Sequence, residues 1–313
     1  MKQPWQIWRD RRGRLSWLRI ATLALLLLPI GIAIYAYVTQ GFGARPLNDL
    51  IHRTGYWALI FLLLSLAVTP LRRIARFGNL IDVRRMIGVG AFFYIAAHLT
   101  LYIADQRYDL GKVASEIVLR LYLTIGFVAL LGLAVLAATS TDAMVKRLGG
   151  MNWRRLHQII YVIGLLALIH YFQQTKADVS VPVFVSGLFT WLMGYRLIAW
   201  WRRGEGELST LLLLVLSVTV AVLTFIGEAV GVGIAYRISP WVILRTAFDF
   251  TYDIRPGWYV LAAGLCVVAI DLVRSRFAQN PRRHHAIRRY PISHVKRPEA
   301  KTGTLTSALV CWK

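Results

Sequence analysis

Two histidines bracket one apolar stretch of the chain, and a third lies in an earlier stretch of the same kind. His157 and His170 stand in residues 152–171, NWRRLHQIIYVIGLLALIHY, with twelve uncharged residues between them. His98 lies in the apolar sequence AAHLTLY, residues 96–102. Ionisable side chains cost free energy in hydrocarbon and usually persist there because they form a functional site. These three histidines are therefore the first candidates for chemistry.

The elements that must position them are membrane-spanning helices. Hydrophobic residues make up 57% of the 313 residues, aromatic residues 12%, and the mean hydropathy is +0.53. Runs of about 17 to 25 apolar residues, enough to cross roughly 30 Å of hydrocarbon, recur along the chain. We expect an all-α, polytopic transmembrane helical bundle with about eight spans, at residues 18–38, 56–70, 86–104, 117–138, 156–172, 181–201, 209–230 and 258–273.

The net charge of +22 is concentrated at the ends of the chain. Residues 1–20 carry six Lys or Arg against one Asp, and residues 276–313 carry nine against one Glu. This distribution favours contact with anionic lipid over nucleic acid, which would need a basic groove within a folded domain. The second, fourth and sixth connections are also rich in arginine and lysine. The positive-inside rule therefore predicts that both termini are cytoplasmic.

This topology converts sequence position into depth. His98 lies twelve residues after the cytoplasmic start of the third span, about 18 Å deep, and His170 lies about 20 Å beyond His157 along the fifth span. His98 and His170 thus share the periplasmic half of the bilayer. Two imidazoles from facing helices at one depth are what a low-spin haem needs. The alternative is that each histidine only forms a hydrogen bond between helices. Small and aromatic residues expected to surround a ring are Ala96, Ala97, Tyr94, Tyr102, Gly164 and Tyr171.

His157 allows more than one interpretation. An ideal helix does not point His157 and His170 at the same neighbour, since thirteen steps of about 100° fall short of four turns by about 140°. On the third span, the residues at the depth of His157 are Arg84 and Arg85. His157 could ligate a second haem, serve as the proton partner of a quinone or flavin with those arginines, or only pack.

Other polar residues near the spans have weaker claims. His52 is expected at the periplasmic entrance of the second span, where interfacial packing is favoured over contact with a haem propionate. Arg84 and Arg85, with Arg154 and Arg155, are expected at the cytoplasmic interface, where arginines either bind propionate or phosphate or anchor the chain in the membrane. Glu228 and Asp271 lie near span ends, and we expect water to solvate them. The tail residues His284, His285 and His294 resemble a metal-binding tract only loosely.

Six motifs in order carry a family resemblance: TPLRR (69–73), RRMIG (84–88), AAHLTLY (96–102), STDAM (140–144), NWRRLHQIIY (152–161) and IHYF (169–172). The chain resembles the MsrQ (YedZ) family, haem-binding membrane subunits of the periplasmic methionine-sulfoxide reductase system, within the ferric-reductase-like transmembrane superfamily. The resemblance covers about residues 15–203. It implies a b-type haem, electrons from the quinone pool of the bacterial inner membrane, and a periplasmic molybdopterin partner, MsrP. Flavin mononucleotide is a further family cofactor, and the essential histidines correspond to His98, His157 and His170.

The predicted organisation has four parts. A basic cytoplasmic N-terminus at 1–17 precedes a six-helix haem-binding core at 18–203, two additional transmembrane helices at 204–275 and a basic disordered tail at 276–313. After the last span the chain has neither the ~100 residues of a compact nucleotide-binding domain nor a glycine-rich phosphate loop, which argues against direct NADPH oxidation. An electron-transfer subunit is favoured. The alternatives are a membrane ferric or metal reductase and a non-redox transporter or scaffold.

Overall fold

The computed structural model describes residues 8–9, 13–41, 45–175, 178–202, 207–251 and 253–278. Residues 1–7 and 10–12 of the predicted basic N-terminus at 1–17, and residues 279–313 of the predicted tail at 276–313 with His284, His285 and His294, lie outside them. Residues up to Arg274 form one compact unit, and a second unit begins at Ser275. The helices are α1 Trp17–Gln40, α2 Pro46–Ile74, α3 Ile81–Asp105, α4 Leu110–Leu119, α5 Leu121–Ala138, α6 Asp142–Leu148, α7 Gly150–His157, α8 Ile160–Gln174, α9 Ser180–Trp201, α10 Thr210–Tyr236, α11 Pro240–Arg245 and α12 Pro256–Ala278, with single 3-10 turns at Gly78–Leu80 and Thr246–Phe248.

Eight helical segments of the described chain are long and apolar enough to cross a membrane, which confirms the predicted all-α polytopic class. Their bounds differ from the predicted ones where local chemistry intervenes. The helix of the second span is expected to begin near Asn48, ahead of the apolar run at 56–70, and α2 begins close to that point because Pro46 suits the first turn of a helix, so α2 contains His52 as expected. The fourth span begins at Leu121 instead of residue 117, because Arg120 has an extended backbone between α4 and α5. The fifth span is divided into α7 and α8 directly after His157.

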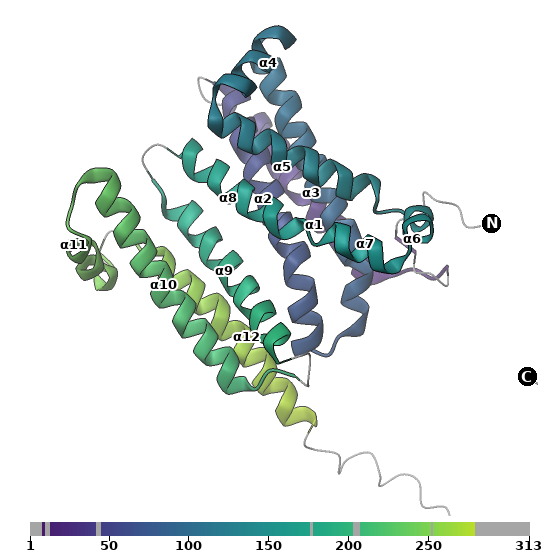
Figure 1. Cartoon of the computed structure of the whole chain (residues 1–313), viewed down its shortest axis with the longest axis vertical. Helices are drawn as coiled ribbons and strands as arrows, with labels where there is room; N and C mark the ends of the chain where they lie inside the picture. The colour runs from purple at the N-terminus through teal and green to yellow at the C-terminus, as the bar shows by residue number, and fades with distance from the viewer. Residues whose placement is uncertain are drawn as a thin grey trace, which may run out of the picture. The chain divides into compact units, whose positions relative to one another are not determined.

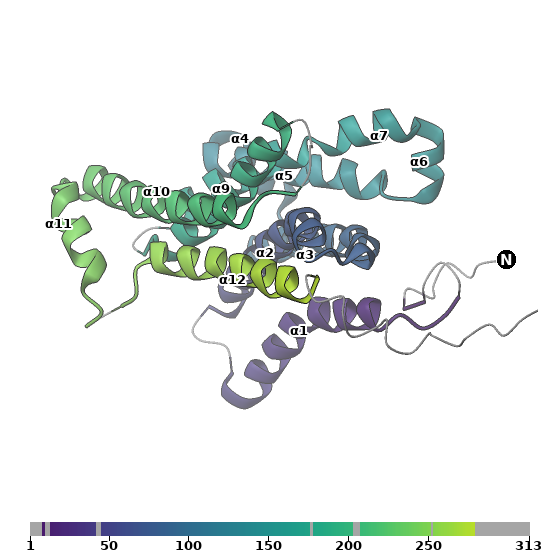
Figure 2. The same ribbon diagram turned by 90° about the horizontal axis from the view of Figure 1, so that it is seen from below.

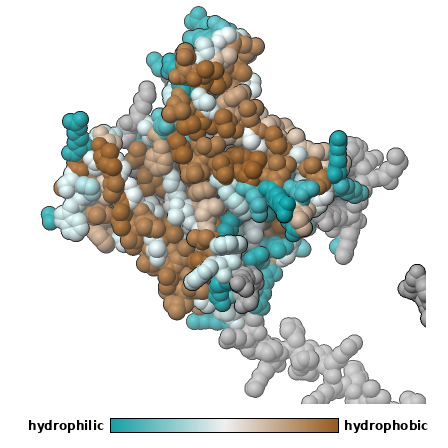
Figure 3. Space-filling view, in the orientation of Figure 1, coloured by the Kyte–Doolittle hydropathy of each residue, from teal (hydrophilic) through white to brown (hydrophobic). Residues whose placement is uncertain are grey.

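Helices close in sequence pack in pairs: α2 with α3, α5 with α8, and α9 with α10 (Figure 1). The buried core between them contains Phe61, Leu66, Ala91 and Val185, each fully or almost fully enclosed. Figure 3 shows hydrophobic side chains spread over much of one face. Outward-facing residues of α10 such as Leu211 and Val215 are more than half exposed, as expected of side chains that meet lipid instead of water.

The additional helices α10 and α12 pack on α9 and on each other through glycines. A Cβ added at Gly187 of α9 would lie 2.5 Å from Val260 and 2.7 Å from the hydroxyl of Thr224. A Cβ at Gly264 of α12 would lie 2.5 Å from Ser217. Small residues at such contacts let helix backbones approach closely in a membrane, where close packing replaces the hydrophobic effect as the driving force.

The prediction that water solvates Glu228 and Asp271 is wrong. Glu228 is 3% exposed and Asp271 7% exposed. Glu228 pairs with Arg255 at 3.2 Å, and the Thr210 hydroxyl donates to Asp271 at 2.6 Å. Both carboxylates lie near helix ends, as expected, but neighbouring helices cover them and supply polar partners. Position within a span therefore did not determine their exposure.

A polar cluster connects the end of α2 to α12. The guanidinium of Arg76 donates two hydrogen bonds to Glu207, at 2.7 and 2.8 Å, and Arg274 donates a third at 2.6 Å. Arg274 also donates to the backbone carbonyl of Ile74. Hydrogen bonding from Arg76 is the main reason why the pKa of Glu207 falls from 4.5 to about 2. This cluster fixes the described start of the additional helices to the core.

Candidate haem site

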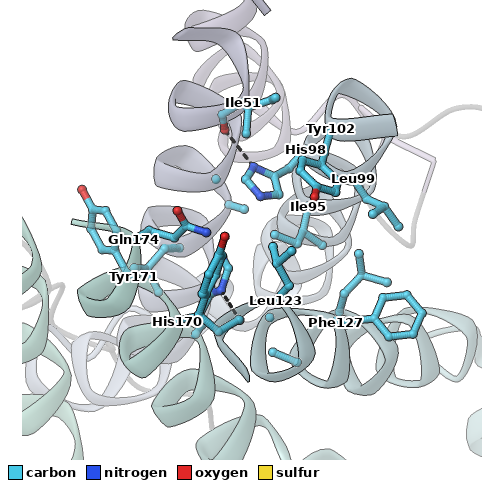
Figure 4. A pocket seen from close by; sticks show the side chains of 18 of the residues that line it. Ile51, Ile95, His98, Leu99, Tyr102, Leu123, Phe127, His170, Tyr171 and Gln174 are labelled. Atoms are coloured by element: carbon cyan, nitrogen blue, oxygen red, sulfur yellow. Dashed lines mark hydrogen bonds between the residues drawn. The ribbon is translucent and has the colours of Figure 1, made fainter. Parts of the chain in front are cut away.

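His98 is positioned by the helix pair α2 and α3. Its Nδ1 lies 2.8 Å from the backbone carbonyl oxygen of Ile51 on α2 (Figure 4). Because a carbonyl oxygen can only accept a hydrogen bond, Nδ1 carries the proton in this arrangement, and Nε2 keeps its lone pair. The orientation of the ring and its tautomer are thus set by the backbone of a neighbouring helix.

His170 is positioned in the same way by the second helix pair, α5 and α8. Its Nδ1 lies 2.7 Å from the backbone carbonyl oxygen of Tyr122 on α5. The same donor and acceptor argument leaves Nε2 unprotonated. Metal-ligating histidines almost always donate their other ring N–H to a carbonyl or carboxylate, which fixes the tautomer and the ring orientation. Both histidines have this arrangement.

The two imidazoles lie across one cavity. Their ring centroids are 6.4 Å apart and their planes are perpendicular. Ligands that hold one metal ion from opposite sides, at metal–nitrogen distances of about 2 Å, would place their ring centroids about 6 Å apart. The cavity has a volume of about 240 Å³ and is lined by apolar residues of α2, α3, α5 and α8, including Leu59, Leu62 and Leu130. Polar groups such as Asn48, Tyr102 and Gln174 line it as well.

Two glycines make room for the two rings. A Cβ added at Gly55 would lie 3.0 Å from Nδ1 of His98, and one added at Gly126 would lie 2.7 Å from Nδ1 of His170. Each glycine stands four residues after the carbonyl that its histidine contacts, Ile51 or Tyr122. In α2 and again in α5, a single turn of helix therefore supplies both the carbonyl that accepts the hydrogen bond and the space for the imidazole ring.

The sequence did not indicate these glycines, since a lone glycine in an apolar helix has many uses. The predicted glycine, Gly164, instead packs against α9, where a Cβ added to it would lie 2.7 Å from the ring of Phe189. Of the aromatic residues expected near a ring, Tyr102 and Tyr171 line the cavity, whereas the Tyr94 hydroxyl donates to the carbonyl of Leu26 on α1. Ala96 and Ala97 are absent from the lining. His52 does line it.

His157 lies away from this cavity, at the end of α7. Its ring stacks on Trp153 with centroids 3.9 Å apart. Its Nδ1 lies 3.1 Å from the carbonyl of Trp153, and its Nε2 lies 3.4 Å from the hydroxyl of Ser140. No second histidine faces it among the described residues.

The arginines beside His157 differ in their partners. Arg85 forms an ion pair with Asp142 at 2.5 Å. Arg84 is half-buried, and the charges close enough to act on it include those of Arg72 and Arg196. Arg196 lies inside span α9, where it donates to the carbonyl of Leu66 and stacks over the ring of Tyr161. Its presence within an apolar span was a signal that the sequence analysis missed. Arg154 and Arg155 are exposed.

Comparison with known proteins first assigns a class. Residues 54–168 match the family model described as "Ferric reductase like transmembrane component". The matched segment contains His98 and His157 and ends two residues before His170. Over this segment the bundle with its paired imidazoles is thus similar to ferric-reductase-like transmembrane proteins. No solved structure matches the chain.

Similar curated proteins then give the family. A Rhodospirillum rubrum protein named "Protein-methionine-sulfoxide reductase heme-binding subunit MsrQ" is 42% identical over 196 residues, covering 62% of this chain and 92% of that protein. A Xanthomonas campestris protein with the same name is 42% identical over 199 residues, covering 61% and 89%. One from Herminiimonas arsenicoxydans is 38% identical over 185 residues, covering 58% and 85%. The chain belongs to the MsrQ family.

Proposed function

We propose that this chain is a haem-carrying electron-transfer subunit of a methionine-sulfoxide reductase system. It would lie in the bacterial inner membrane with both termini cytoplasmic, accept electrons from quinol, and pass them to the periplasmic molybdopterin protein MsrP. The observation that carries the proposal is the pair of imidazoles whose Nε2 atoms have no hydrogen-bond partner among the described residues and lie across one cavity. The family names add support, since the relatives are called heme-binding subunits.

The residues present fit a b-type haem that His98 and His170 would hold. A bound haem supplies a reversible one-electron iron couple. The carbonyls of Ile51 and Tyr122 hold the Nδ1 protons, so both Nε2 atoms can face iron. Apolar side chains such as Leu59 and Leu62 exclude water from the ring faces. His52 and Gln174 line the same cavity and can hydrogen-bond to propionates.

A packing role for the two histidines accounts less well for the geometry. An imidazole that only joins two helices would be expected to satisfy both ring nitrogens, because an unsatisfied polar atom costs free energy in a membrane. Here one nitrogen of each ring is bonded and the other is left without a protein partner among the described residues. The chemistry of the donor set, two neutral imidazoles across a cavity, favours a metal-centred group between them.

We also propose that the region around His157 is where electrons enter. His157 would take one of the two protons that quinol releases when it gives up two electrons, or Arg84 would hold the phosphate of flavin mononucleotide or a propionate of a second haem. The support for an anion is the proximity of Arg84 to Arg72 and Arg196, an excess of positive charge that a phosphate or propionate would offset. Arg85 could join only by leaving Asp142.

The test of the proposal is pyridine haemochrome quantification on purified protein from haem-replete cells. We expect wild type to contain haem b with a reduced-minus-oxidised spectrum, and His98→Ala and His170→Ala to lose it. His157→Ala is the comparison variant, and one haem per chain should survive in it. A colourless wild-type preparation would overturn the proposal. Released flavin, measured by fluorescence after denaturation, tests the flavin separately.

A membrane metal reductase is the second candidate, because the matching family model is described as ferric reductase like. It would use the same haem and differ only in the electron acceptor. With quinol as donor, a ferric chelate and an oxidised periplasmic protein plus its molybdopterin reductase are supplied in parallel assays. Faster turnover with the second acceptor supports the leading proposal, and faster turnover with the chelate supports the metal reductase.

A further inference from the structure

A second cavity, of about 300 Å³, lies between α1 and α2. Its walls are apolar, formed by Pro29, Ile30, Ala33 and Ile34 of α1 with Leu50 and Trp57 of α2. It is separate from the haem cavity, which is lined by Ile51, Gly55 and Tyr56 from the opposite side of the same turns of α2. None of the proposed electron-transfer steps uses it. We call it the α1 groove.

The α1 groove exists because α1 contacts α3 at Leu26 and then diverges from α2. The Tyr94 hydroxyl donates to the carbonyl of Leu26 at 2.7 Å, and Leu26 packs over Gly90, where a Cβ would lie 2.6 Å away. Three residues later Pro29 interrupts the hydrogen bonding of α1, a common cause of helix bending. Beyond this level α1 runs away from α2 (Figure 2).

The interior of the α1 groove can donate few hydrogen bonds. The Thr54 hydroxyl donates to the carbonyls of Leu50 and Ile51 at 2.8 and 3.0 Å, and the Tyr94 hydroxyl donates to Leu26. Each hydroxyl has one hydrogen, which these bonds use. Besides Arg53, Tyr37 and Trp57 are the other lining residues with a side-chain donor, and the remaining walls offer a ligand only apolar contact, as a hydrocarbon chain needs.

One cation, Arg53, lines the α1 groove. Its guanidinium has no hydrogen-bond or ion-pair partner among the described residues. α2 has 29 residues and is therefore about 43 Å long, against roughly 30 Å of hydrocarbon, and Arg53 lies about 10 Å from its start. That depth is close to the edge of the hydrocarbon, where a long side chain reaches the headgroups. An unpaired cation at this level attracts a phosphate.

We propose that the α1 groove binds one acyl chain of a phospholipid whose phosphate pairs with Arg53. Hydrocarbon walls and a cation at the mouth match the two halves of that ligand. The isoprenoid tail of a quinone would also fit the walls. Its neutral ring, however, gives the charge of Arg53 no anion to pair with, whereas the phosphate of a phospholipid does. The bound lipid would support the turn of α2 that supplies Ile51 and Gly55 to His98.

The experiment uses full-length protein in vesicles that contain phosphatidylglycerol with a photoactivatable acyl chain, and cross-linked peptides are identified by mass spectrometry. We expect labelling of α1 around Ala33 and of α2 around Leu50. Arg53→Gln should reduce this labelling about fivefold, the factor that one basic residue near a lipid surface contributes. Arg107→Gln, which removes an exposed arginine just after the end of α3, is the matched control and should not change it.

A second variant, Ala33→Trp, fills the groove and should abolish labelling there while cross-links elsewhere on the protein persist. The gel-filtration profile and the thermal unfolding of the same variants in detergent report whether either variant is misfolded. Unchanged labelling in both variants would overturn the proposal. So would displacement of the label by added ubiquinone but not by unlabelled phosphatidylglycerol, because the occupant would then be a quinone. These readouts do not depend on electron transfer, so the α1 groove can fail while the haem proposal stands.

Discussion

Glycines bring helices together both around the candidate haem cavity and in the additional helices, with opposite results. At Gly187, Gly194 and Gly264 the vacant space is filled by side chains of a neighbouring helix, namely Thr224 and Val260, Leu216, and Ser217. At Gly55 and Gly126 the space is filled by the edge of an imidazole. The first arrangement joins helices, and the second orients a ring toward a cavity.

The polar groups of the two regions differ in the same way. In the additional helices the Ser217 hydroxyl accepts from the Trp191 indole at 3.0 Å and donates to Leu213 at 2.7 Å. The Thr224 hydroxyl donates to Val220, and Glu228 is paired with Arg255. Around the cavity His98 and His170 each have one nitrogen bonded and one without a protein partner among the described residues. A buried polar group that is satisfied indicates packing, and one left open toward a cavity indicates a site.

Some glycines face an imidazole, and others face side chains of a neighbouring helix. Among substitutions that distinguish the two kinds, we expect the largest loss of haem at Gly126. Gly126→Ala places a methyl group 2.7 Å from Nδ1 of His170, which must move away from the carbonyl of Tyr122. The ring then loses its fixed orientation, and the loss of such a supporting hydrogen bond typically costs about 10- to 100-fold in metal affinity. Gly55→Ala should have a smaller effect, because the distance there is 3.0 Å. Haem per polypeptide and the reduction midpoint potential are the measurements.

Two glycine controls interpret this result. Gly227→Ala makes the same change at a helical position with nothing within 4 Å, and Gly194→Ala creates a 2.7 Å contact with Leu216. We expect both to keep haem, and only Gly194→Ala to lower thermal stability. Equal haem loss in Gly126→Ala and Gly194→Ala would mean that crowding anywhere in the bundle expels the cofactor.

The sequence predicted the helices of this protein better than the contacts of its side chains. Hydrophobic length determined the eight spans, and depth matched His98 with His170 before any contact was known. Sequence patterns could not identify Gly55 and Gly126, because their role depends on which helix lies opposite. They also could not show that Glu228 and Asp271 are covered, since burial near a helix end depends on neighbours from distant parts of the chain.

A smaller effect, on stability alone, is expected at Glu228. Glu228→Ala leaves Arg255 without its carboxylate in a partly buried place, where Thr246 is its remaining hydrogen-bond partner. Breaking a fully buried pair costs about 3 to 5 kcal/mol, and because Arg255 is about one-third exposed we expect about 2 kcal/mol. Thermal unfolding in detergent measures it, with Glu116→Ala, which removes a helical surface pair with Arg120, as control. Loss of haem without loss of stability would contradict a purely structural role for this pair.

The smallest effect is a pH dependence at the cluster that connects α2 to α12. Hydrogen bonding from Arg76 holds the pKa of Glu207 at about 2 in the folded protein, below its ordinary 4.5. A lowered folded pKa means that the carboxylate stabilises the fold fully above about pH 4.5 and loses this contribution as the pH falls toward 2. Because Glu207 and Arg76 are 40% and 58% exposed, solvent screening limits the contribution to under about 1 kcal/mol. Glu207→Gln should therefore unfold slightly earlier than wild type at about pH 6, and the difference between the two melting temperatures should shrink as the pH falls toward 2. If the difference between the two melting temperatures stayed constant over this range, the effect of Glu207→Gln would come from the shape of the amide. The ion pairs of Glu207 with Arg76 and Arg274 would then contribute nothing to stability.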